Sequence, residues 1–366
     1  MALTIHGTVS DNTVALDRKT ATPIIINGDM AISQRGTTLS SQSSSTRLLD
    51  RFANDIGGGG AITISQDTDT PNDTFLNSMK LVVATADSSI ASSDAYRVTY
   101  SVEGSDIATV GLGTSGCQTM TLTFWVRSSV TGTYGIGFAN SAETENYVDE
   151  YTISSANTWE KKVINIPVRT SGTWLTNNGV GLGIRWDLGS GTAYNGTADS
   201  WQTTSSKVYR TSSCVNWIAT SSATFYLTGV QLEIGTFADD NALPPFQFED
   251  VSTSLARCQR YYIRLNAEAP YTIFGTGVCT TSTVSNGTIA LPTQMRDLMT
   301  ITSDGNFRIV DGDGTHAITT LAFDNNSRGI QMFRFDATTS GLNDGNGSFL
   351  SANNDSTAYI EVEAEL

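Results

Sequence analysis

The chain has 366 residues, and 36 acidic against 21 basic side chains give a formal net charge of −15. This length favours two domains over one small core. The acidic balance argues against a nucleic-acid binder, whose affinity comes from neutralising phosphates, and against attraction to an anionic membrane surface. No run of apolar residues approaches the roughly 20 that a membrane-spanning helix needs, so we expect no membrane insertion.

Residues 1–22 are predicted to be an N-terminal arm. They are largely polar apart from a short alternating run at 3–6. The arm lacks the basic start and sustained apolar run of a secretion signal. A segment this short and polar is poorly ordered unless it docks on something. Two interpretations stay open: a frayed terminus, or an attachment arm on a larger assembly.

Residues 23–237 are predicted to form an antiparallel β-sandwich of the jelly-roll kind. Thr, Ser, Gly and Asn are abundant, and short β-rich runs alternate with Gly and Asn turns. Short strands without helices between them indicate antiparallel sheets packed face to face. Nine strands are expected, at 61–66, 78–84, 96–102, 119–126, 132–139, 147–153, 159–166, 179–187 and 223–232.

A linker and a short helix are predicted at 238–262. Pro244 and Pro245 break any continuing strand, and Asp250 can cap the start of the helix. A helix of about twelve residues is marginal alone in water. It therefore packs either on the neighbouring domain or, as a trimer seam, on copies of itself. The seam would be a narrow stripe at steps of 4, 3 and 4, formed by Val251, Leu255, Cys258 and Tyr262.

Residues 263–366 are predicted to form a second β-sandwich, a tip domain. The pair Asp304 and Gly305, between two expected strands, predicts a hairpin turn. No repeat of 20–50 residues is visible, which disfavours propellers and solenoids. The strands are expected at 261–265, 271–280, 287–291, 299–303, 306–310, 317–323, 329–335 and 358–363. The whole chain is thus predicted to be all-β, with two sandwich domains joined by a linker and a short helix.

Five motifs stand in the order in which a family of phage tail fibre and virion appendage proteins carries them. They are NGDMAISQR at 27–35, LDRF at 49–52, TLTFWVRS at 121–128, TGVQLEIG at 228–235 and LARCQRYY at 255–262. The chain resembles that family over about residues 25–262, and LPTQMR at 291–296 is similar to a recurrent strand end in the family's β-rich tips.

The resemblance implies a structural virion protein, typically homotrimeric. Its first domain would be a jelly-roll module like carbohydrate-binding modules, and its second a variable β-rich tip. The implied partners are further copies of the chain, other virion proteins contacted through the arm, and a host surface glycan or protein. The implied location is the virion, after synthesis in the host cytoplasm.

Catalysis has little support in the sequence. There are two histidines, His6 and His316, so no nucleophile, base and orienting group can be assembled. A run of acidic residues near a strand start is usually a solvated loop, and nothing fixes the carboxylate separation that a glycosidase needs. The run comprises Glu143, Glu145, Asp149 and Glu150. We expect no catalytic residues and no enzyme activity.

Metal and cofactor sites are not predicted either. The loop 311–314, Asp-Gly-Asp-Gly, lacks the later glutamate of a calcium loop and is interpreted as a hairpin. Jelly-roll carbohydrate modules of the resembling kind often hold a structural calcium, but no ligands for one can be assigned here. The four scattered cysteines have no metal-ligand spacing and are interpreted as small buried hydrophobes.

The tryptophans give the clearest lead to sugar contact. Aromatic faces pack against the apolar faces of pyranose rings, while polar neighbours hold the hydroxyls. Four aromatic residues fall in or beside loops rich in Gly, Thr and Asn, where a sandwich usually carries recognition. The candidates for carbohydrate binding are Trp174, Trp186, Tyr194 and Trp201. Packing at a buried rim is the alternative for each of them.

The sequence therefore predicts a homotrimeric tail fibre or receptor-binding appendage of a bacteriophage. Two other classes stay open. A capsid decoration or head-fibre protein would share the fold and the trimer but lie on the head. A soluble carbohydrate-binding module, or a polysaccharide depolymerase with a hidden carboxylate pair, would show affinity or turnover on a polysaccharide.

Overall fold

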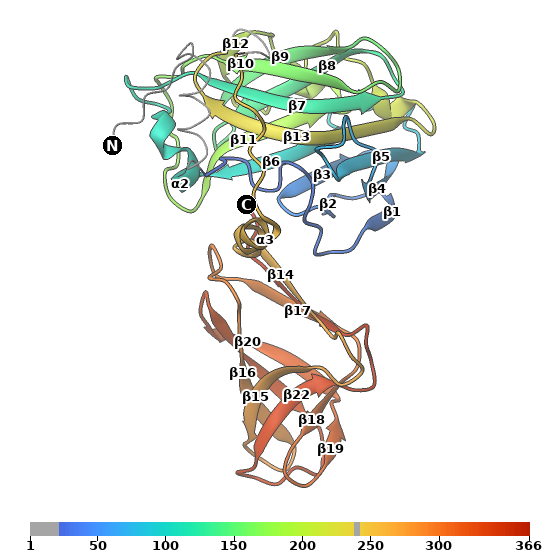
Figure 1. Ribbon diagram of the computed structural model, residues 1–366, viewed down its shortest axis with the longest axis vertical. Coiled ribbons are helices and arrows are strands. Elements are labelled where there is room, and N and C mark those ends of the chain that lie inside the picture. Colours follow the sequence, from blue (N-terminus) through green and yellow to red (C-terminus); the bar gives the residue numbers. More distant parts are fainter. Residues whose placement is uncertain (1–21, 238–241) are drawn as a thin grey trace, which may run out of the picture. The chain divides into compact units, whose positions relative to one another are not determined.

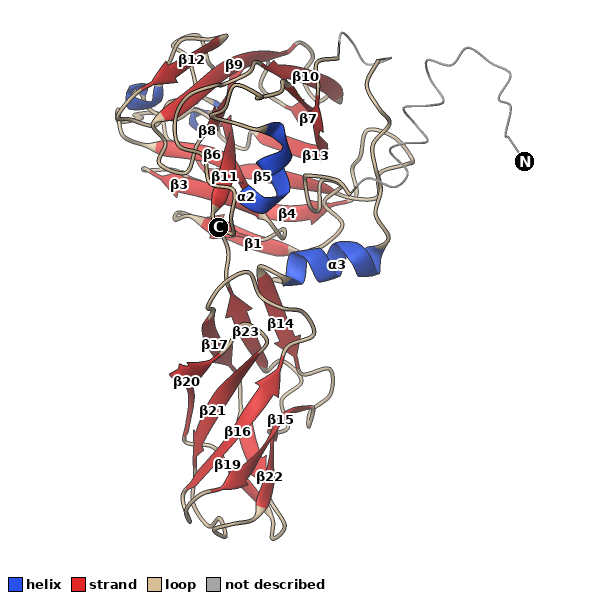
Figure 2. Ribbon diagram, turned by 90° about the vertical axis from the view of Figure 1, so that its left-hand side faces the viewer, coloured by secondary structure: helices blue, strands red, loops and turns tan. Residues whose placement is uncertain are grey.

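The computed structural model describes residues 22–237 and 242–366, so the predicted arm lies outside the described residues except for Thr22. The chain divides into an N-terminal unit that ends at Ser254 and a C-terminal unit that comprises Leu255–Glu365. Strands dominate both units (Figure 2). The fold is all-β, with two antiparallel sandwiches joined by a linker and a short helix, as the sequence predicted.

One sheet of the N-terminal unit has six strands in the order β1-β4-β5-β13-β7-β10. β7 and β13 run side by side in this sheet (Figure 1). Apolar residues at alternate positions of β7, from Met120 to Val126, are fully buried because successive side chains of a strand point to opposite faces. The bounds are β1 Thr38–Gln42, β4 Ala61–Asp67, β5 Ser78–Thr85, β7 Met120–Ser128, β10 Glu160–Ile166 and β13 Thr224–Ile234.

The other sheet of this unit has seven strands in the order β12-β9-β8-β11-β6-β3-β2. All of its pairs are antiparallel, and β12 lies at one edge with β9 as its partner. The bounds are β2 Thr46–Arg47, β3 Phe52–Gly57, β6 Ala95–Glu103, β8 Gly132–Ala139, β9 Glu145–Ile153, β11 Val180–Asp187 and β12 Ser200–Thr203.

The two sheets enclose one aromatic-rich core. Trp186 of β11 is fully buried, and its ring meets Phe124 of β7 edge to face with centroids 5.8 Å apart. Phe52 of β3 packs on Tyr100 of β6 at 4.9 Å. Rings of this size dominate the energetics of a core because each buries a large apolar area. The helix α2, Gly104–Ile107, follows β6 and contributes Ile107 to the same core.

The predicted short helix is α3, Val251–Gln259. Asp250 caps it as expected, since its Oδ1 accepts a hydrogen bond from the backbone N–H of Thr253 at 3.0 Å. Within residues 22–237 and 242–366, no helix is long and apolar enough to cross a membrane.

The C-terminal unit contains a three-stranded sheet, β14-β23-β17, and a seven-stranded sheet, β19-β18-β22-β15-β16-β21-β20. Its core includes Phe307, Phe333 and Phe335. The bounds are β14 Tyr262–Asn266, β15 Ile273–Cys279, β16 Val284–Ala290, β17 Thr300–Asp304, β18 Phe307–Val310, β19 Thr315–Ala317, β20 Thr320–Arg328, β21 Met332–Thr338, β22 Gly347–Ala352 and β23 Tyr359–Glu363.

The hairpin predicted at Asp304 and Gly305 is wrong. β17 pairs with β23 of the three-stranded sheet, whereas β18 pairs with β19 and β22 of the seven-stranded sheet. Gly305 does adopt the left-handed conformation that a turn uses, with φ at 101°. The turn therefore transfers the chain between two sheets. The hairpin interpreted at 311–314 is confirmed, because it joins the paired strands β18 and β19.

Candidate functional site

Two of the four predicted aromatic residues lie together in the N-terminal unit. The indole rings of Trp174 and Trp201 meet edge to face, with centroids 5.7 Å apart and planes at 88°. Both side chains are half-buried. The sequence interval of 27 residues from Trp174 to Trp201 gave no sign of this contact. The pair is the centre of the candidate site.

The other two predicted residues lie elsewhere. Trp186 is 0% exposed in the core, so its ring cannot meet a sugar, and its assignment to the site is wrong. Trp186 continues the pattern of alternating apolar residues in β11. The sequence alone instead placed it beside a loop, because the neighbouring segments are rich in Gly and Thr. Tyr194 stacks on Tyr209 at 4.8 Å and donates its hydroxyl to the carbonyl of Ser93 at 3.0 Å. These contacts indicate a packing role for Tyr194.

Trp201 is positioned by the edge strand β12. It pairs in register with Tyr147 of β9, and the two rings are in contact at 5.4 Å. Its Nε1 donates to the carbonyl of Pro167 at 3.0 Å. Because the indole N–H is already bonded to the backbone, the ring itself is the part of Trp201 that a ligand would contact.

Trp174 lies in the segment between β10 and β11. Its Nε1 donates to the carbonyl of Ser171 at 3.0 Å, which folds the segment back on itself. Gly113 permits this packing, because a Cβ at Gly113 would lie 2.8 Å from Trp174 Cδ1 and its φ of 80° is left-handed. The hydroxyl-bearing residues Ser171 and Thr173 of the same segment are exposed.

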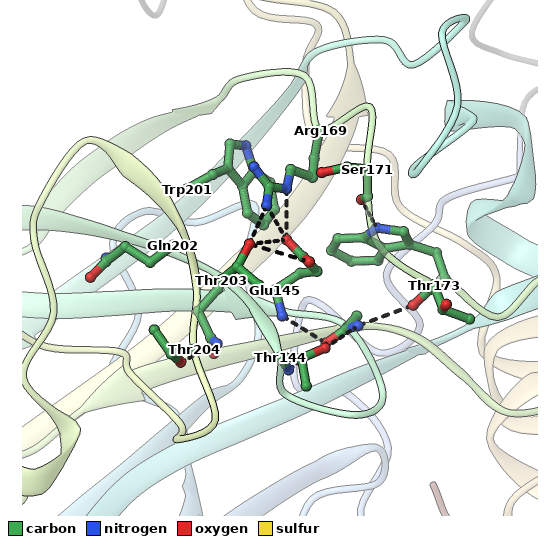
Figure 3. Close-up of polar contacts among 12 residues, drawn as sticks. Thr144, Glu145, Arg169, Ser171, Thr173, Trp201, Gln202, Thr203 and Thr204 are labelled. Carbon is green, nitrogen blue, oxygen red and sulfur yellow. Dashed lines mark hydrogen bonds and ion pairs between the residues drawn. The ribbon is translucent and has the colours of Figure 1, made fainter.

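A buried carboxylate and a guanidinium group lie beside the indole ring of Trp201 (Figure 3). Arg169 Nε donates to Glu145 Oε2 at 2.7 Å, and its Nη2 donates to the same oxygen and to Thr203 Oγ1. The guanidinium carbon lies 5.8 Å from the ring centre of Trp201. Charge-assisted hydrogen bonds of this kind fix geometry more firmly than neutral ones. Arg169, Glu145 and Thr203 therefore form a polar wall next to an aromatic surface.

Asn140 ties the polar wall to the Trp174 segment. Its Oδ1 accepts hydrogen bonds from the backbone N–H groups of Thr144 and Glu145, at 2.9 and 3.1 Å. Its Nδ2 donates to the carbonyl of Thr173 at 3.0 Å. Asn140 is almost fully buried, so these bonds are shielded from water. One amide thus fixes both the turn between β8 and β9 and the loop that carries Trp174.

The acidic run at 143–150 is more than the solvated loop that the sequence indicated. Glu145 is 6% exposed and belongs to β9, and Glu143 is bonded to Arg185 at 2.5 Å and to Lys207 at 2.9 Å. Sequence reasoning missed Arg169, Thr203 and Asn140 altogether. Their roles depend on contacts between segments that the chain brings together only in the fold.

The site as a whole offers half-buried aromatic rings, exposed hydroxyls and a fixed ion pair. Such a surface can hold a neutral, hydroxyl-rich ring by apolar contact on one face and hydrogen bonds at its edge. No metal cluster of three or more His, Cys, Asp or Glu residues occurs among residues 22–237 and 242–366. His316 lies 3.3 Å from Asp311 in the C-terminal unit, and His6 lies outside the described residues.

The four residues of the predicted trimer seam differ widely in their exposure to solvent. Val251 is 67% exposed and Leu255 is half-buried, whereas Cys258 and Tyr262 are 0% and 1% exposed. Tyr262 belongs to β14 rather than to the helix. Cys258 and Tyr262 are thus enclosed by the chain itself and are not available to another copy. Only Val251 and Leu255 of the predicted stripe are left to make a seam.

No family model matches the sequence, and no curated protein matches it. Among solved structures, the chain is similar to the enzymatically active domain of tailspike protein 4 of bacteriophage CBA120, with a TM-score of 0.30 and 12% identity over 58% of this chain and 21% of that one. The chain therefore spans only about a fifth of that tailspike structure.

Two sugar-binding structures are similar to a comparable extent. One is a putative sugar binding protein from Bacteroides thetaiotaomicron, with a TM-score of 0.32 and 12% identity over 58% of this chain and 100% of that one. The other is a family 11 carbohydrate-binding module from Clostridium thermocellum, with a TM-score of 0.29 and 11% identity over 55% and 95%. All three TM-scores are below 0.5, so these likenesses add no argument about function.

Proposed function

We propose that this chain is a non-catalytic, carbohydrate-binding virion protein of a bacteriophage, which contacts a host surface glycan through the Trp174–Trp201 site. The observation that carries the proposal is the contact between these two half-buried rings beside the Arg169–Glu145 ion pair. Aromatic surface gives the apolar contact, and the polar wall gives partners for sugar hydroxyls.

The burial of Glu145 supports a binding role for the polar wall. Glu145 Oε2 accepts both hydrogen bonds from Arg169, and the Thr203 hydroxyl lies 3.2 Å from Oε2 and 3.4 Å from Oε1. A carboxylate oxygen accepts more than one hydrogen bond, so Oε1 has capacity for a sugar hydroxyl. A fixed acceptor costs less entropy on binding than a mobile one.

The virion assignment rests on the five sequence motifs between residues 27 and 262. We propose a homotrimeric tail fibre or receptor-binding appendage, with residues 1–22 as the attachment to other virion proteins. Three copies would present three sites, and linked weak sites gain avidity without any new contact. A head-fibre or capsid decoration protein would use the same site from a different place on the particle.

A glycan array tests the binding claim. The wild-type chain is expected to bind a defined set of glycans, and Trp201→Ala is expected to lose that binding by at least about tenfold, the scale of a central aromatic contact. Trp159→Ala is a matched control, because Trp159 is also half-buried but bonds to Asp69, outside the site. Equal binding by wild type and Trp201→Ala would contradict the site.

Activity and location are tested separately. Incubation of each bound glycan with the wild-type chain is expected to release no new reducing ends, whereas turnover would make the protein a depolymerase. Antibody labelling of intact particles is expected to mark the tail. Label on the head would favour the decoration protein, and unlabelled particles would contradict the virion assignment.

A further inference from the structure

An arginine and a tyrosine stack on the seven-stranded sheet of the C-terminal unit. The guanidinium carbon of Arg308, in β18, lies 4.3 Å from the ring centre of Tyr271, which comes two residues before β15. Arg308 stands opposite Ser351 of β22, and its Nε donates to Ser351 Oγ at 3.0 Å. β18, β22 and β15 are neighbours in this sheet (Figure 1). The ring and the hydroxyl therefore hold the guanidinium group in one orientation.

Alternation along the strands shows which side chains share the face of Arg308. Phe307 and Ile309 of β18 are buried in the core, so Arg308 between them points to the opposite face. Leu350 of β22 is buried in the same core, which places its neighbour Phe349 on the face of Arg308. Arg308 and Phe349 thus lie together on the outer face of the sheet.

Three large side chains with apolar surface are exposed around the guanidinium group. Tyr271 is 51% exposed, Phe349 is 46% exposed, and Ile273, which pairs with Ser351, is 58% exposed. Single exposed apolar residues are common, but several on one face indicate a surface that contacts a ligand or a partner. The charge in their midst indicates what kind of ligand that is.

The guanidinium group of Arg308 has hydrogen-bonding capacity left. It carries five N–H donors, and the one on Nε bonds Ser351. Its Nη1 and Nη2 form no hydrogen bond and no ion pair with any residue in the described parts of the chain, and neither atom is buried. The residues opposite Arg308 in the sheet, Ala317 and Ser351, carry no charge. A positively charged fork is therefore open to a ligand.

A second arginine–tyrosine stack in the same unit shows what Arg308 lacks. The guanidinium carbon of Arg264 lies 3.7 Å from the ring centre of Tyr359, and its Nη1 is 3.6 Å from Glu361 Oε1. That stack has its carboxylate within the chain. Arg308 repeats the stack without the carboxylate, so the missing counter-charge is one that a ligand can supply.

The carboxylate of Asp355 is already engaged by other groups. The backbone N–H of Asp355 donates to the carbonyl of Pro270 at 3.0 Å, which places this residue in the same region of the unit. Its Oδ2 accepts from the backbone N–H of Asn306 at 2.9 Å, and its Oδ1 accepts from the hydroxyl of Thr357 at 2.6 Å. More distant acidic groups are screened at physiological ionic strength beyond about 8 Å. The net negative charge of the chain therefore does not close this site to an anion.

We propose that Arg308, Tyr271 and Phe349 form a second binding site, which takes a sugar that carries a carboxylate group. The guanidinium fork holds the carboxylate through parallel hydrogen bonds, and the exposed rings contact the apolar face of the sugar. A peptide fits this surface less well, because an extended peptide adds to a sheet edge and a helical one needs a groove. β18, β22 and β15 are inner strands of their sheet. The site goes beyond the proposed function, which concerns the other unit.

Titrations of the full chain by saturation-transfer NMR test the site with two acidic probes. Methyl glucuronoside and the methyl glycoside of N-acetylneuraminic acid carry the carboxylate on different sugars, and methyl glucoside is the neutral counterpart of the first. At least one acidic probe is expected to bind about tenfold or more tightly than methyl glucoside, the scale of a charge-assisted hydrogen bond. The probe that binds identifies the source of the carboxylate. Acidic probes that bind no better than methyl glucoside would overturn the proposal.

Arg308→Gln identifies the group responsible. It is expected to weaken binding of the acidic probe by about tenfold or more, because the charged fork is lost. Arg334→Gln is the matched control, since it removes the same charge from an arginine of the same sheet that pairs with Asp336 at 2.8 Å. This control is expected to bind as the wild type does. Unchanged binding in Arg308→Gln, or an equal loss in both variants, would overturn the site.

Phe349→Ala tests the apolar part of the site and does not depend on the folding of Arg308→Gln. Because Phe349 is exposed, the truncation is expected to leave the fold intact and to weaken binding of the acidic probe several-fold. Light scattering is expected to give the wild-type mass for this variant. A lower mass, together with no binding of either acidic probe by the wild type, would assign the face to contact between copies of the chain and overturn the proposal.

Trp201→Ala separates this site from the Trp174–Trp201 site. The variant is expected to bind the acidic probe as the wild type does, because Trp201 lies in the N-terminal unit. A loss in Trp201→Ala without a loss in Arg308→Gln would move the carboxylate contact to the N-terminal unit and overturn the site at Arg308. If no neutral glycan binds at all, the proposed function fails, while the acidic probes still decide the site at Arg308.

Discussion

Arg169 and Glu145 form a nearly buried ion pair, in which Arg169 Nε donates to Glu145 Oε2 at 2.7 Å. Their side chains are 20% and 7% exposed. The pair joins the segment after β10 to the start of β9, on which the Trp201 ring also packs through Tyr147. Breaking it is therefore expected to affect both the stability of the unit and the shape of the aromatic site.

We predict that Glu145→Gln lowers the free energy of unfolding by about 1–3 kcal/mol, the usual cost of losing a charge-assisted hydrogen bond at a buried position. Urea denaturation measures this change. Glu268→Gln is the matched control, because Glu268 is exposed and its substitution is expected to change stability by less than about 0.5 kcal/mol. Equal stability of both variants would show that the pair contributes nothing measurable.

Substitution of Trp186 tests whether this residue belongs to the hydrophobic core or to the candidate site. Trp186→Ala is expected to cost about 3–5 kcal/mol, because it removes a fully buried ring that contacts Phe124. Trp174→Ala is expected to cost less, since its ring is half-buried. Chemical denaturation of the two variants compares them directly. A smaller loss for Trp186→Ala than for Trp174→Ala would contradict the placement of Trp186 in the core.

Burial raises the pKa of Asp149 to about 7, which predicts a particular pH dependence of stability. The unfolded carboxyl group titrates near 3.8 and the folded one near 7, so between these values the native state binds the extra proton. The contribution of Asp149 to the free energy of unfolding therefore falls as pH rises from about 4 to about 7, and then levels off. Thermal unfolding from pH 4 to pH 8 is expected to show a smaller decline for Asp149→Asn than for the wild type. Parallel curves would contradict the shifted pKa.

The oligomeric state is predicted to be a trimer with a seam at Val251 and Leu255. Light scattering of the wild-type chain is expected to give three times the mass of one chain, and Leu255→Asp is expected to lower it because a charge would enter the seam. A mass of one chain for the wild type would contradict the predicted trimer. A trimer that tolerates Leu255→Asp would place the three-fold contact in the β-sandwiches.

Much of the fold was predictable from local patterns. All nine strands expected between 61 and 232 are present within two or three residues of their predicted bounds, because alternating apolar residues and turn signals are local properties. The short strand β12 was missed, since its four residues carry only Trp201 as an apolar side chain. β22 was missed because Gly and Asn residues on both sides indicated loops.

The site was predictable only in part. Loop composition identified Trp174 and Trp201 as candidates, but it also selected Trp186. That residue belongs to β11, where alternating apolar side chains point into the core. Arg169 and Asn140 gain their roles from hydrogen bonds to residues 24 and 33 positions away. Such long-range pairings leave no periodic signal in one sequence, and only the three-dimensional structure brings them together.

Isothermal titration calorimetry of the array-selected glycan tests the central claim most directly. We predict measurable binding by the wild type and by Trp159→Ala, a loss of at least about tenfold for Trp174→Ala and for Trp201→Ala, and retained fold in all four proteins by circular dichroism. The contradicting result would be unchanged affinity in both site variants, which would place any glycan contact away from the Trp174–Trp201 pair.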